Sequence, residues 1–186
     1  MTEDRVLVDA ALAGEPGAFE RLVREHERLC WHIVFRMVRN AEDARELCQE
    51  TFLRVHQRLR QFRYESALKT WIGRVAYSIA LRHLERRRVT VSLDDEQELR
   101  IPDEPPAEFD LEAACANAQL AEFLQGAIDE LAPVPRTVLT LYHVDDLSIP
   151  EIARITGLAP GTIKSHLFRT RLRLKEQLAP RLGKLR

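Results

Sequence analysis

LSIPEIARITGLAPGTIKSHLFRTRLRLK, residues 147–175, is the stretch that decides the fold. Ser148 is a suitable N-cap for a short helix, and Pro150 fits the first turn because its missing N–H would have no partner there. Glycine adopts left-handed backbone at little cost, so Gly157 predicts the end of this helix. A second helix is predicted to begin near Pro160. The stretch therefore has the pattern of a helix-turn-helix.

The second predicted helix has two contrasting sides. Positions at steps of three and four predict a buried side made of Ile163, Leu167, Thr170 and Leu174. The opposite side carries hydrogen-bond donors and cations, namely Thr162, Lys164, Ser165, His166, Arg169 and Arg171. Such groups contact base edges and phosphates in a major groove, so we predict that these six residues bind DNA. A basic amphipathic helix alone is often only a solvated face, but the short helix and glycine turn before it favour DNA.

Composition sets the broad class of the protein. Its 186 residues suffice for one or two domains with cores of their own. No apolar run approaches the roughly 20 residues of a membrane helix, and the N-terminus has no signal-peptide pattern, so we expect a cytoplasmic protein without membrane insertion. Cys30, Cys48 and Cys115 include no Cys-x-x-Cys pair, which argues against a disulfide framework or a zinc ribbon and indicates buried thiols.

Charge is segregated along the chain although the net charge is −1. Residues 1–88 carry +4, residues 89–130 carry −11 and residues 131–186 carry +6. The acidic part begins with a segment that contains three prolines and has no sustained period, so residues 89–110 are predicted to be a linker. We therefore expect two domains, 1–88 and 111–186. Basic ends that bind nucleic acid would produce this pattern, and so would two domains with a solvated linker.

Apolar residues at helical spacing predict an all-α protein, because no segment has the period of two that a strand requires. Asn40 is expected to cap one helix, and Ser66 is one possible cap for another. Besides the helix-turn-helix, the predicted helices span residues 16–38, 41–59, 67–88, 111–131 and 135–144.

The segment from Arg54 to Arg88 is strongly basic, with ten basic residues against two acidic ones, and aromatic residues lie among them. Guanidinium groups follow phosphates and aromatic rings stack on unpaired bases, so the mixture suits single-stranded or melting DNA. Trp71 falls on the apolar stripe of its predicted helix, which favours a packing role for that ring.

Catalytic and metal-binding patterns are weak. His26 and Cys30 lie one helical turn apart, but no second pair with ligand spacing accompanies them. The sequence has no nucleophile–base arrangement and no phosphate-binding glycine loop. We expect neither an enzyme nor a cofactor.

Two long segments resemble one family. Residues 18–88, AFERLVREHERLCWHIVFRMVRNAEDARELCQETFLRVHQRLRQFRYESALKTWIGRVAYSIALRHLERRR, resemble region two of bacterial sigma factors of the extracytoplasmic-function (ECF) group. Residues 131–178, LAPVPRTVLTLYHVDDLSIPEIARITGLAPGTIKSHLFRTRLRLKEQL, resemble region four of the same group. The resemblance covers about residues 16–180, in the family's order.

The resemblance implies partners and roles for individual residues. It implies binding to core RNA polymerase and promoter DNA, and regulation by an anti-sigma factor. Docking on core polymerase is implied for Asp43, Glu46, Gln49, Glu50 and Arg54. Reading and melting of the minus-ten element are implied for Arg63, Tyr64, Trp71, Arg74, Ser78, Arg82, His83 and Arg86. The helix from Pro160 matches the reader of the minus-thirty-five element, and the acidic linker matches the segment that threads through the polymerase.

The sequence departs from the family pattern at three positions. Arg45 stands where an acidic residue is usual, Ser78 where asparagine is usual, and Arg82 where aspartate is frequent. Ser78 has fewer hydrogen-bonding groups than asparagine, which predicts an altered minus-ten preference. The alternative function is a stand-alone helix-turn-helix regulator that binds duplex operators. The docking segment around Gln49 and the lack of an alternating strand and helix domain argue against it.

Overall fold

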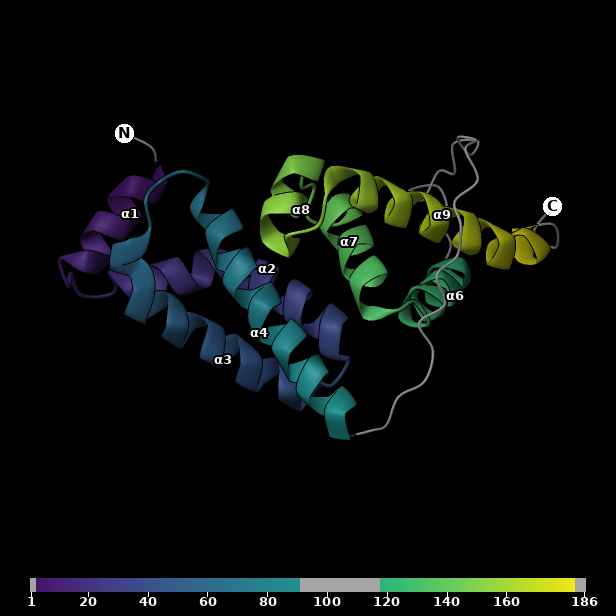
Figure 1. The fold of residues 1–186 in the computed structure, drawn as a ribbon, viewed down its shortest axis with the longest axis horizontal. Helices are drawn as coiled ribbons and strands as arrows, with labels where there is room; N and C mark the ends of the chain where they lie inside the picture. The colour runs from purple at the N-terminus through teal and green to yellow at the C-terminus, as the bar shows by residue number, and fades with distance from the viewer. Residues whose placement is uncertain (1–2, 91–117, 183–186) are drawn as a thin grey trace.

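The computed structural model describes residues 3–90 and 118–182, and every regular element within these ranges is a helix, which confirms the predicted all-α class (Figure 1). The predicted linker 89–110 lies outside the described residues except for its first two positions, which end a helix. Residues 111–117, where another helix was predicted to begin, also lie outside them. The helices are α1 (Glu3–Leu12), α2 (Ala18–Val38), α3 (Ala41–Arg58), η1 (Leu59–Gln61), α4 (Leu68–Thr90), α6 (Ala118–Asp129), α7 (Pro133–His143), α8 (Ile149–Thr156) and α9 (Pro160–Leu182).

Helices α1 to α4 form the N-terminal unit, in which α2 packs on α1, α3 and α4. Asn40 caps α3 as predicted, since its side chain accepts hydrogen bonds from the N–H groups of Glu42 and Asp43. Helix α1 was not predicted. Its Asp4 carboxylate accepts a hydrogen bond from the N–H of Leu68 at 2.7 Å, at the start of α4. The predicted cap Ser66 is wrong, because its hydroxyl donates to the Ala67 carbonyl instead.

Helices α6 to α9 form the C-terminal unit, and α8 and α9 are the two helices of the predicted helix-turn-helix. Ser148 and Glu151 form a reciprocal capping box at the start of α8, and Gly157 ends that helix at φ 77°. Burial alone would raise the pKa of Glu151, but hydrogen bonds from Ser148 and the nearby Lys69 ammonium lower it overall. The predicted buried side of α9 is confirmed, since Ile163, Leu167, Thr170 and Leu174 are all buried.

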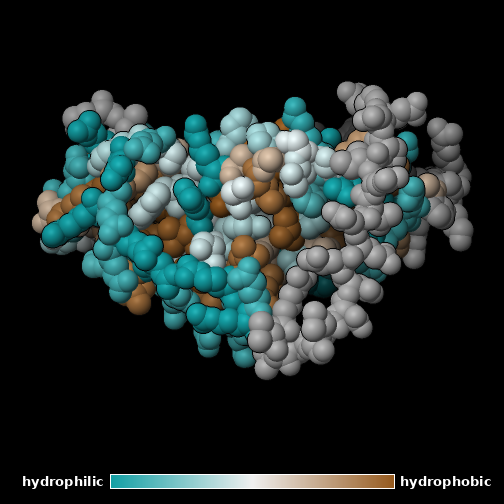
Figure 2. All heavy atoms as spheres, viewed as in Figure 1, coloured by the Kyte–Doolittle hydropathy of each residue, from teal (hydrophilic) through white to brown (hydrophobic). Residues whose placement is uncertain are grey.

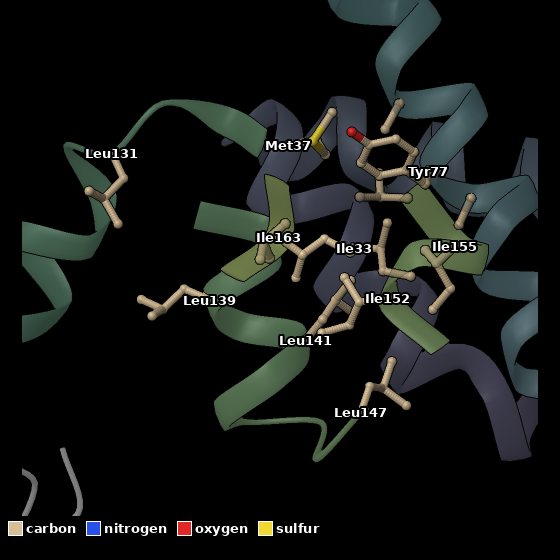
Figure 3. Close-up of a cluster of buried hydrophobic side chains, with 14 of the residues drawn as sticks. Ile33, Met37, Tyr77, Leu131, Leu139, Leu141, Leu147, Ile152, Ile155 and Ile163 are labelled. Carbon is tan, nitrogen blue, oxygen red and sulfur yellow. The ribbon is translucent and has the colours of Figure 1, made fainter. Parts of the chain in front are cut away.

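One hydrophobic core joins the two units. Ile33 and Met37 of α2 and Tyr77 of α4 lie in the same buried cluster as Leu141 of α7 and Ile155 of α8 (Figure 3). Gly73 lets α8 approach α4 closely: a Cβ atom there would lie 3.1 Å from the Ile155 Cδ1 and 3.2 Å from the Ile33 Cδ1. Helix α8 is therefore packed directly on the N-terminal unit.

Arg136 of α7 provides the main polar contact between the units. It is 3% exposed, and its guanidinium donates to the carbonyls of Arg36 at 2.6 Å and Met37 at 3.5 Å, at the C-terminal end of α2. It also donates to the carbonyls of Asp129 and Leu131, both at 2.9 Å. The last carbonyls of a helix lack internal partners and attract cations, so Arg136 completes the end of α2. Burial, followed by the charge of Arg39, lowers the pKa of Arg136 to about 10.

Ion pairs between the units, among them the following three, surround this core. The Lys69 Nζ of α4 lies 3.2 Å from the Glu151 Oε1 of α8. The His32 Nδ1 lies 2.7 Å from the Asp145 Oδ1, and the Arg36 guanidinium lies 3.4 Å from the Asp129 Oδ1. Each pair joins the N-terminal unit to the C-terminal one, so apolar and polar contacts fix the same arrangement.

Candidate nucleic-acid interface

The N-terminal half of α9 presents most of the residues that were predicted to bind the upstream element. Thr162 and Lys164 are exposed, while Ser165, His166 and Arg169 are half-buried. The Ser165 hydroxyl donates to the Gly161 carbonyl at 2.9 Å, which orients it along the helix. Burial, and then the charge of Arg169, lower the pKa of His166 and favour the neutral ring. This end of α9 combines neutral donors with cations, as a major-groove reader requires.

Arg171, the sixth predicted DNA-binding residue of α9, has partners on α7. Its guanidinium lies over the Tyr142 ring at 5.4 Å from the centroid, and its Nε donates to the His143 Nε2 at 3.2 Å. These contacts tie Arg171 of α9 to α7. Sequence spacing could not show this, because the contact crosses between helices.

A row of predicted minus-ten residues follows one side of α4. Trp71, Arg74, Ser78 and Arg82 are spaced by three, four and four positions, which places them on one helical face. Arg74 and Arg82 are exposed, and Trp71 and Ser78 are half-buried. We call these four residues the α4 row. Hydrophilic residues cover much of the surface over the C-terminal half of α4 (Figure 2).

Two positions that depart from the family pattern contact each other within the α4 row. The Arg82 Nη2 donates to the Ser78 Oγ at 3.1 Å, and the Arg82 Nε donates to the Ser78 carbonyl at 3.2 Å. An aspartate at position 82 could not donate in this way, because an ionised carboxylate only accepts. The two residues that depart from the family pattern, Ser78 and Arg82, are therefore linked by a hydrogen bond between their side chains.

Tyr64 lies just before α4 in the left-handed region, at φ 57°, and α1 holds it there. Its hydroxyl donates to the Asp9 Oδ1 at 3.0 Å, and its ring lies near the ring of Phe62 and the guanidinium of Arg5. Trp71 packs beside the smaller buried cluster of this unit, which agrees with the predicted packing role. Arg63, which precedes Tyr64 in the sequence, is exposed.

His83 of α4 and Asp43 of α3, which were predicted for different surfaces, contact each other. The His83 Nε2 lies 3.5 Å from the Asp43 Oδ2, and the Arg87 Nη1 donates to the same oxygen at 2.9 Å. The pair therefore lies between α4 and the start of α3, apart from the α4 row. Arg86 is exposed on the same turn of α4 and also has an interaction partner.

The outer side of α3 brings together the other predicted docking residues. Glu46, Gln49 and Glu50 are exposed, and Glu50 accepts a hydrogen bond from Arg54 at 2.7 Å. Leu53 lies one turn further on and is 59% exposed. Leu53 was not among the predicted docking residues, although it is a leucine outside the inward stripe of an amphipathic helix, which can indicate an interaction site.

A groove of about 640 Å³ runs between α2 and α3, next to this docking side. Val23, Trp31 and Phe52 give it apolar walls, and Gln49 connects it to the outer side of α3. Trp31 stacks on Phe35 with a centroid distance of 5.3 Å. The groove thus offers apolar area beside polar docking groups.

The possible metal pair of the sequence does not form a site in the part of the chain that is described. The buried His26 directs its Nδ1 to the Leu22 carbonyl at 2.9 Å, so this nitrogen acts as a donor. Groups of three or more His, Cys, Asp or Glu side chains placed to hold a metal are absent from the described residues.

Family models match both units of the chain. Residues 22–90 match Sigma-70 region 2, and residues 123–174 match Sigma-70 region 4. These two regions define the class of RNA polymerase sigma subunits.

Individual relatives indicate which group of sigma subunits the chain resembles. The chain is 30% identical to the ECF RNA polymerase sigma-E factor of Salmonella typhimurium over 182 residues, which are 95% of each chain. It is 29% identical to the RNA polymerase sigma-H factor of Pseudomonas aeruginosa over 97% of this chain and 96% of that one. The fold is similar to that of the sigma factor RpoE of Bartonella quintana, which was solved with the anti-sigma factor NepR. The TM-score is 0.65, the sequence identity is 20%, and the match covers 88% of this chain and 98% of that one.

The chain belongs to the ECF group of RNA polymerase sigma factors. It is an alternative sigma factor, which binds core RNA polymerase and directs promoter-specific transcription initiation. Across the described helices, no segment is both long and apolar enough to span a membrane.

Proposed function

We propose that this sigma factor reads its promoters with the α4 row and the N-terminal half of α9, and docks on core polymerase through the outer side of α3. The observation that carries this proposal is the α4 row, where two exposed arginines flank half-buried Ser78 and follow Trp71 on one helical face. Cations spaced along a helix neutralise successive phosphates, and an aromatic ring at one end can stack on a base.

At the minus-ten element, a base must leave the stack before it can be read. This costs a few kcal/mol, which a basic surface and stacking partners offset. Arg63 and Tyr64 lie just ahead of the α4 row and extend it, while Ser78 and Arg82 act as a hydrogen-bonded pair. We expect this pair to give a minus-ten preference different from that of family members with asparagine and aspartate there.

At the minus-thirty-five element, the exposed end of α9 enters the major groove of the duplex. Thr162, Ser165 and His166 supply neutral hydrogen-bonding groups, and Lys164 and Arg169 supply charge. Binding by this helix alone is expected to be weak, because a single module forms a small interface.

Core polymerase is expected to contact Glu46, Gln49, Glu50 and the exposed Leu53, with the apolar groove beside them. An exposed leucine surrounded by carboxylates is typical of an interface centre with a polar rim. Arg54 is held by Glu50 at the edge of this surface.

An anti-sigma factor is the proposed regulator, supported by the similar fold of a sigma factor solved with such a partner. We further propose that the protein acts in the cytoplasm, is not an enzyme, and consists of domains 1–88 and 111–186 joined by the acidic linker. It would be held inactive until a stress or envelope signal arrives.

The test combines the purified chain with core polymerase, measures complex formation by gel filtration, and sequences the RNA transcribed from fragmented genomic DNA. Lys164→Ala and Arg169→Ala should each lower transcription from promoters that depend on the upstream element by about ten-fold while core binding is unchanged. Leu53→Asp should abolish core binding. Arg173→Ala, which changes an exposed cation of α9 outside the predicted reader, is the matched control.

Two outcomes would contradict the proposal. Loss of core binding in Lys164→Ala or Arg169→Ala would mean that the wrong face of α9 was assigned. Failure of the chain to bind core polymerase, with tight footprints on duplex DNA when the chain is alone, would instead identify a stand-alone regulator.

A further inference from the structure

Two cysteines that are eighteen positions apart in the sequence lie together between α2 and α3. Cys30 of α2 is fully buried, and Cys48 of α3 is half-buried. The Cys30 thiol interacts with the Cys48 sulfur and with the Thr51 hydroxyl, which lies one turn beyond Cys48 on the same face of α3. Neither cysteine is bonded to another residue.

The two sulfurs differ in their access to solvent. Cys48 forms part of the wall of the groove between α2 and α3, beside Trp31 and Phe52, whereas Cys30 lies behind it in the core. A molecule that enters the groove therefore reaches Cys48 first. Arg28 also lines this groove and places a cation near its wall.

Their mutual interaction also makes the two thiols chemically unequal. A hydrogen bond from the Cys30 thiol stabilises the Cys48 thiolate and lowers the pKa of Cys48, although partial burial opposes this. The same hydrogen bond, together with burial, raises the pKa of Cys30. Thiolates, not thiols, are the nucleophiles, so Cys48 is the reactive member of the pair.

We propose that Cys48 is a modification site for hydroperoxides that enter the groove, and that Cys30 resolves the oxidised sulfur into a Cys30–Cys48 disulfide. In the first step the Cys48 thiolate attacks the distal oxygen of the hydroperoxide, the O–O bond breaks, and Cys48 becomes a sulfenic acid. The alkoxide or hydroxide that leaves takes up the proton that the Cys48 thiol released on ionisation and becomes the alcohol or water. In the second step the Cys30 sulfur attacks the Cys48 sulfur, the S–O bond breaks, and water leaves with the Cys30 proton. The thiol pair loses two electrons and the hydroperoxide gains them.

The experiment uses the full chain with Cys115→Ser, which leaves only the two native thiols in question. After treatment with hydrogen peroxide the intact mass should fall by about 2 Da, and dithiothreitol should restore it. Tryptic digestion without reduction should join the peptide LCWHIVFR, residues 29–36, to ELCQETFLR, residues 46–54. Retention of the monomer in gel filtration shows that the bond forms within one chain.

Two further variants separate reactivity from packing. In Cys30→Ala the sulfenic acid of Cys48 should persist and be trapped by dimedone, and alkylation of Cys48 by iodoacetamide should slow about ten-fold near neutral pH because its hydrogen-bond donor is lost. In Cys48→Ser the remaining Cys30 should stay unmodified in the native chain. If Cys30→Ala does not fold, the pH profile of Cys48 alkylation in the Cys115→Ser chain provides the same information.

The proposal is overturned if Cys48 in the folded Cys115→Ser chain resists peroxide as completely as Cys30 does, while both react in urea. It is also overturned if the only disulfides formed join separate chains. Neither outcome depends on polymerase or promoter binding, so this test stands apart from that of the proposed function.

Discussion

Arg136 is a charged side chain that the fold encloses almost completely, and four carbonyl oxygens from both units receive its hydrogen bonds. We expect Arg136→Ala to lower the free energy of unfolding by about 3 kcal/mol, because buried carbonyls lose charged donors and a cavity remains. Arg136→Lys should recover only part of this, since a lysine ammonium cannot reproduce the fork of a guanidinium. Urea unfolding monitored by circular dichroism measures both effects.

Arg154→Ala is the matched control, because Arg154 is an exposed arginine of the same unit. Its effect should stay within about 0.5 kcal/mol. Equal losses in Arg136→Ala and Arg154→Ala would show that the buried contacts of Arg136 add nothing to stability.

Single residues were predictable where their environment is local. The buried side of α9 followed from spacing alone, and Gly157 from the backbone it must adopt. Arg136 could not be predicted, since arginine is normally exposed and two of its four acceptors are about a hundred positions away in α2. The contact of Arg171 with α7 could not be predicted either, because its partner His143 lies on another helix.

At the scale of helices, the capping box of α8 is the clearest local determinant. Ser148→Ala removes a hydroxyl that accepts from the N–H of Glu151 and donates to its carboxylate. We expect a loss of about 1 kcal/mol in the free energy of unfolding. Ser66→Ala provides the comparison, because Ser66 does not cap α4, and it should change stability by less than about 0.5 kcal/mol. A larger loss in Ser66→Ala than in Ser148→Ala would refute this assignment of caps.

The contact of α9 with α7 should weaken in acid. Burial, and then the charge of Arg171, lower the pKa of His143, so the unfolded chain binds a proton more readily than the folded one. The contribution of His143 is therefore fully present above about pH 6.5 and is lost as the pH falls below that value. Between about pH 7.5 and pH 5.5, His143→Gln should lose less stability than the wild type in urea unfolding. Parallel losses in both proteins would exclude His143 as a contributor.

Helices with long periodic patterns were predictable, and the caps Asn40 and Ser148 marked two starts correctly. Helix α1 was missed, because its ten residues bury only Leu7 and Val8 and depend on distant partners. Its Asp4 and Asp9 contact Leu68 and Tyr64, which no sequence spacing indicates. The start of α4 therefore depends on a helix that lies more than fifty positions earlier.

At the scale of the whole molecule, the sequence suggested two units and an acidic segment between them, but not how the units pack. The core shared by α2, α4, α7 and α8 is made of apolar residues from both units (Figure 3). Their spacing in the sequence would fit a separate core in each unit equally well. Apolar stripes indicate that a helix side is buried, but they do not name the helix that covers it.

Replacing Gly73 by leucine tests this packing. The Ile155 and Ile33 methyl groups lie too near to accommodate a large side chain, so Gly73→Leu should separate α8 from α4. Amide hydrogen exchange in α8 should accelerate about ten-fold or more, with helix content retained. Gly126→Leu is the control, because a Cβ atom at Gly126 meets nothing within 4 Å. Unchanged exchange in Gly73→Leu would contradict the close approach of the two helices.

The contact of Ile155 with Gly73 also ties the binding equilibria of the two units to each other. A ligand that needs the side of α4 now covered by α8 binds only molecules whose units have separated. If separation costs about 3 kcal/mol, fewer than roughly one molecule in a hundred is competent at any moment, and the apparent affinity falls by the same factor. A second ligand that holds the units apart removes this penalty. By reciprocity, the factor by which each of two such ligands strengthens the binding of the other is identical.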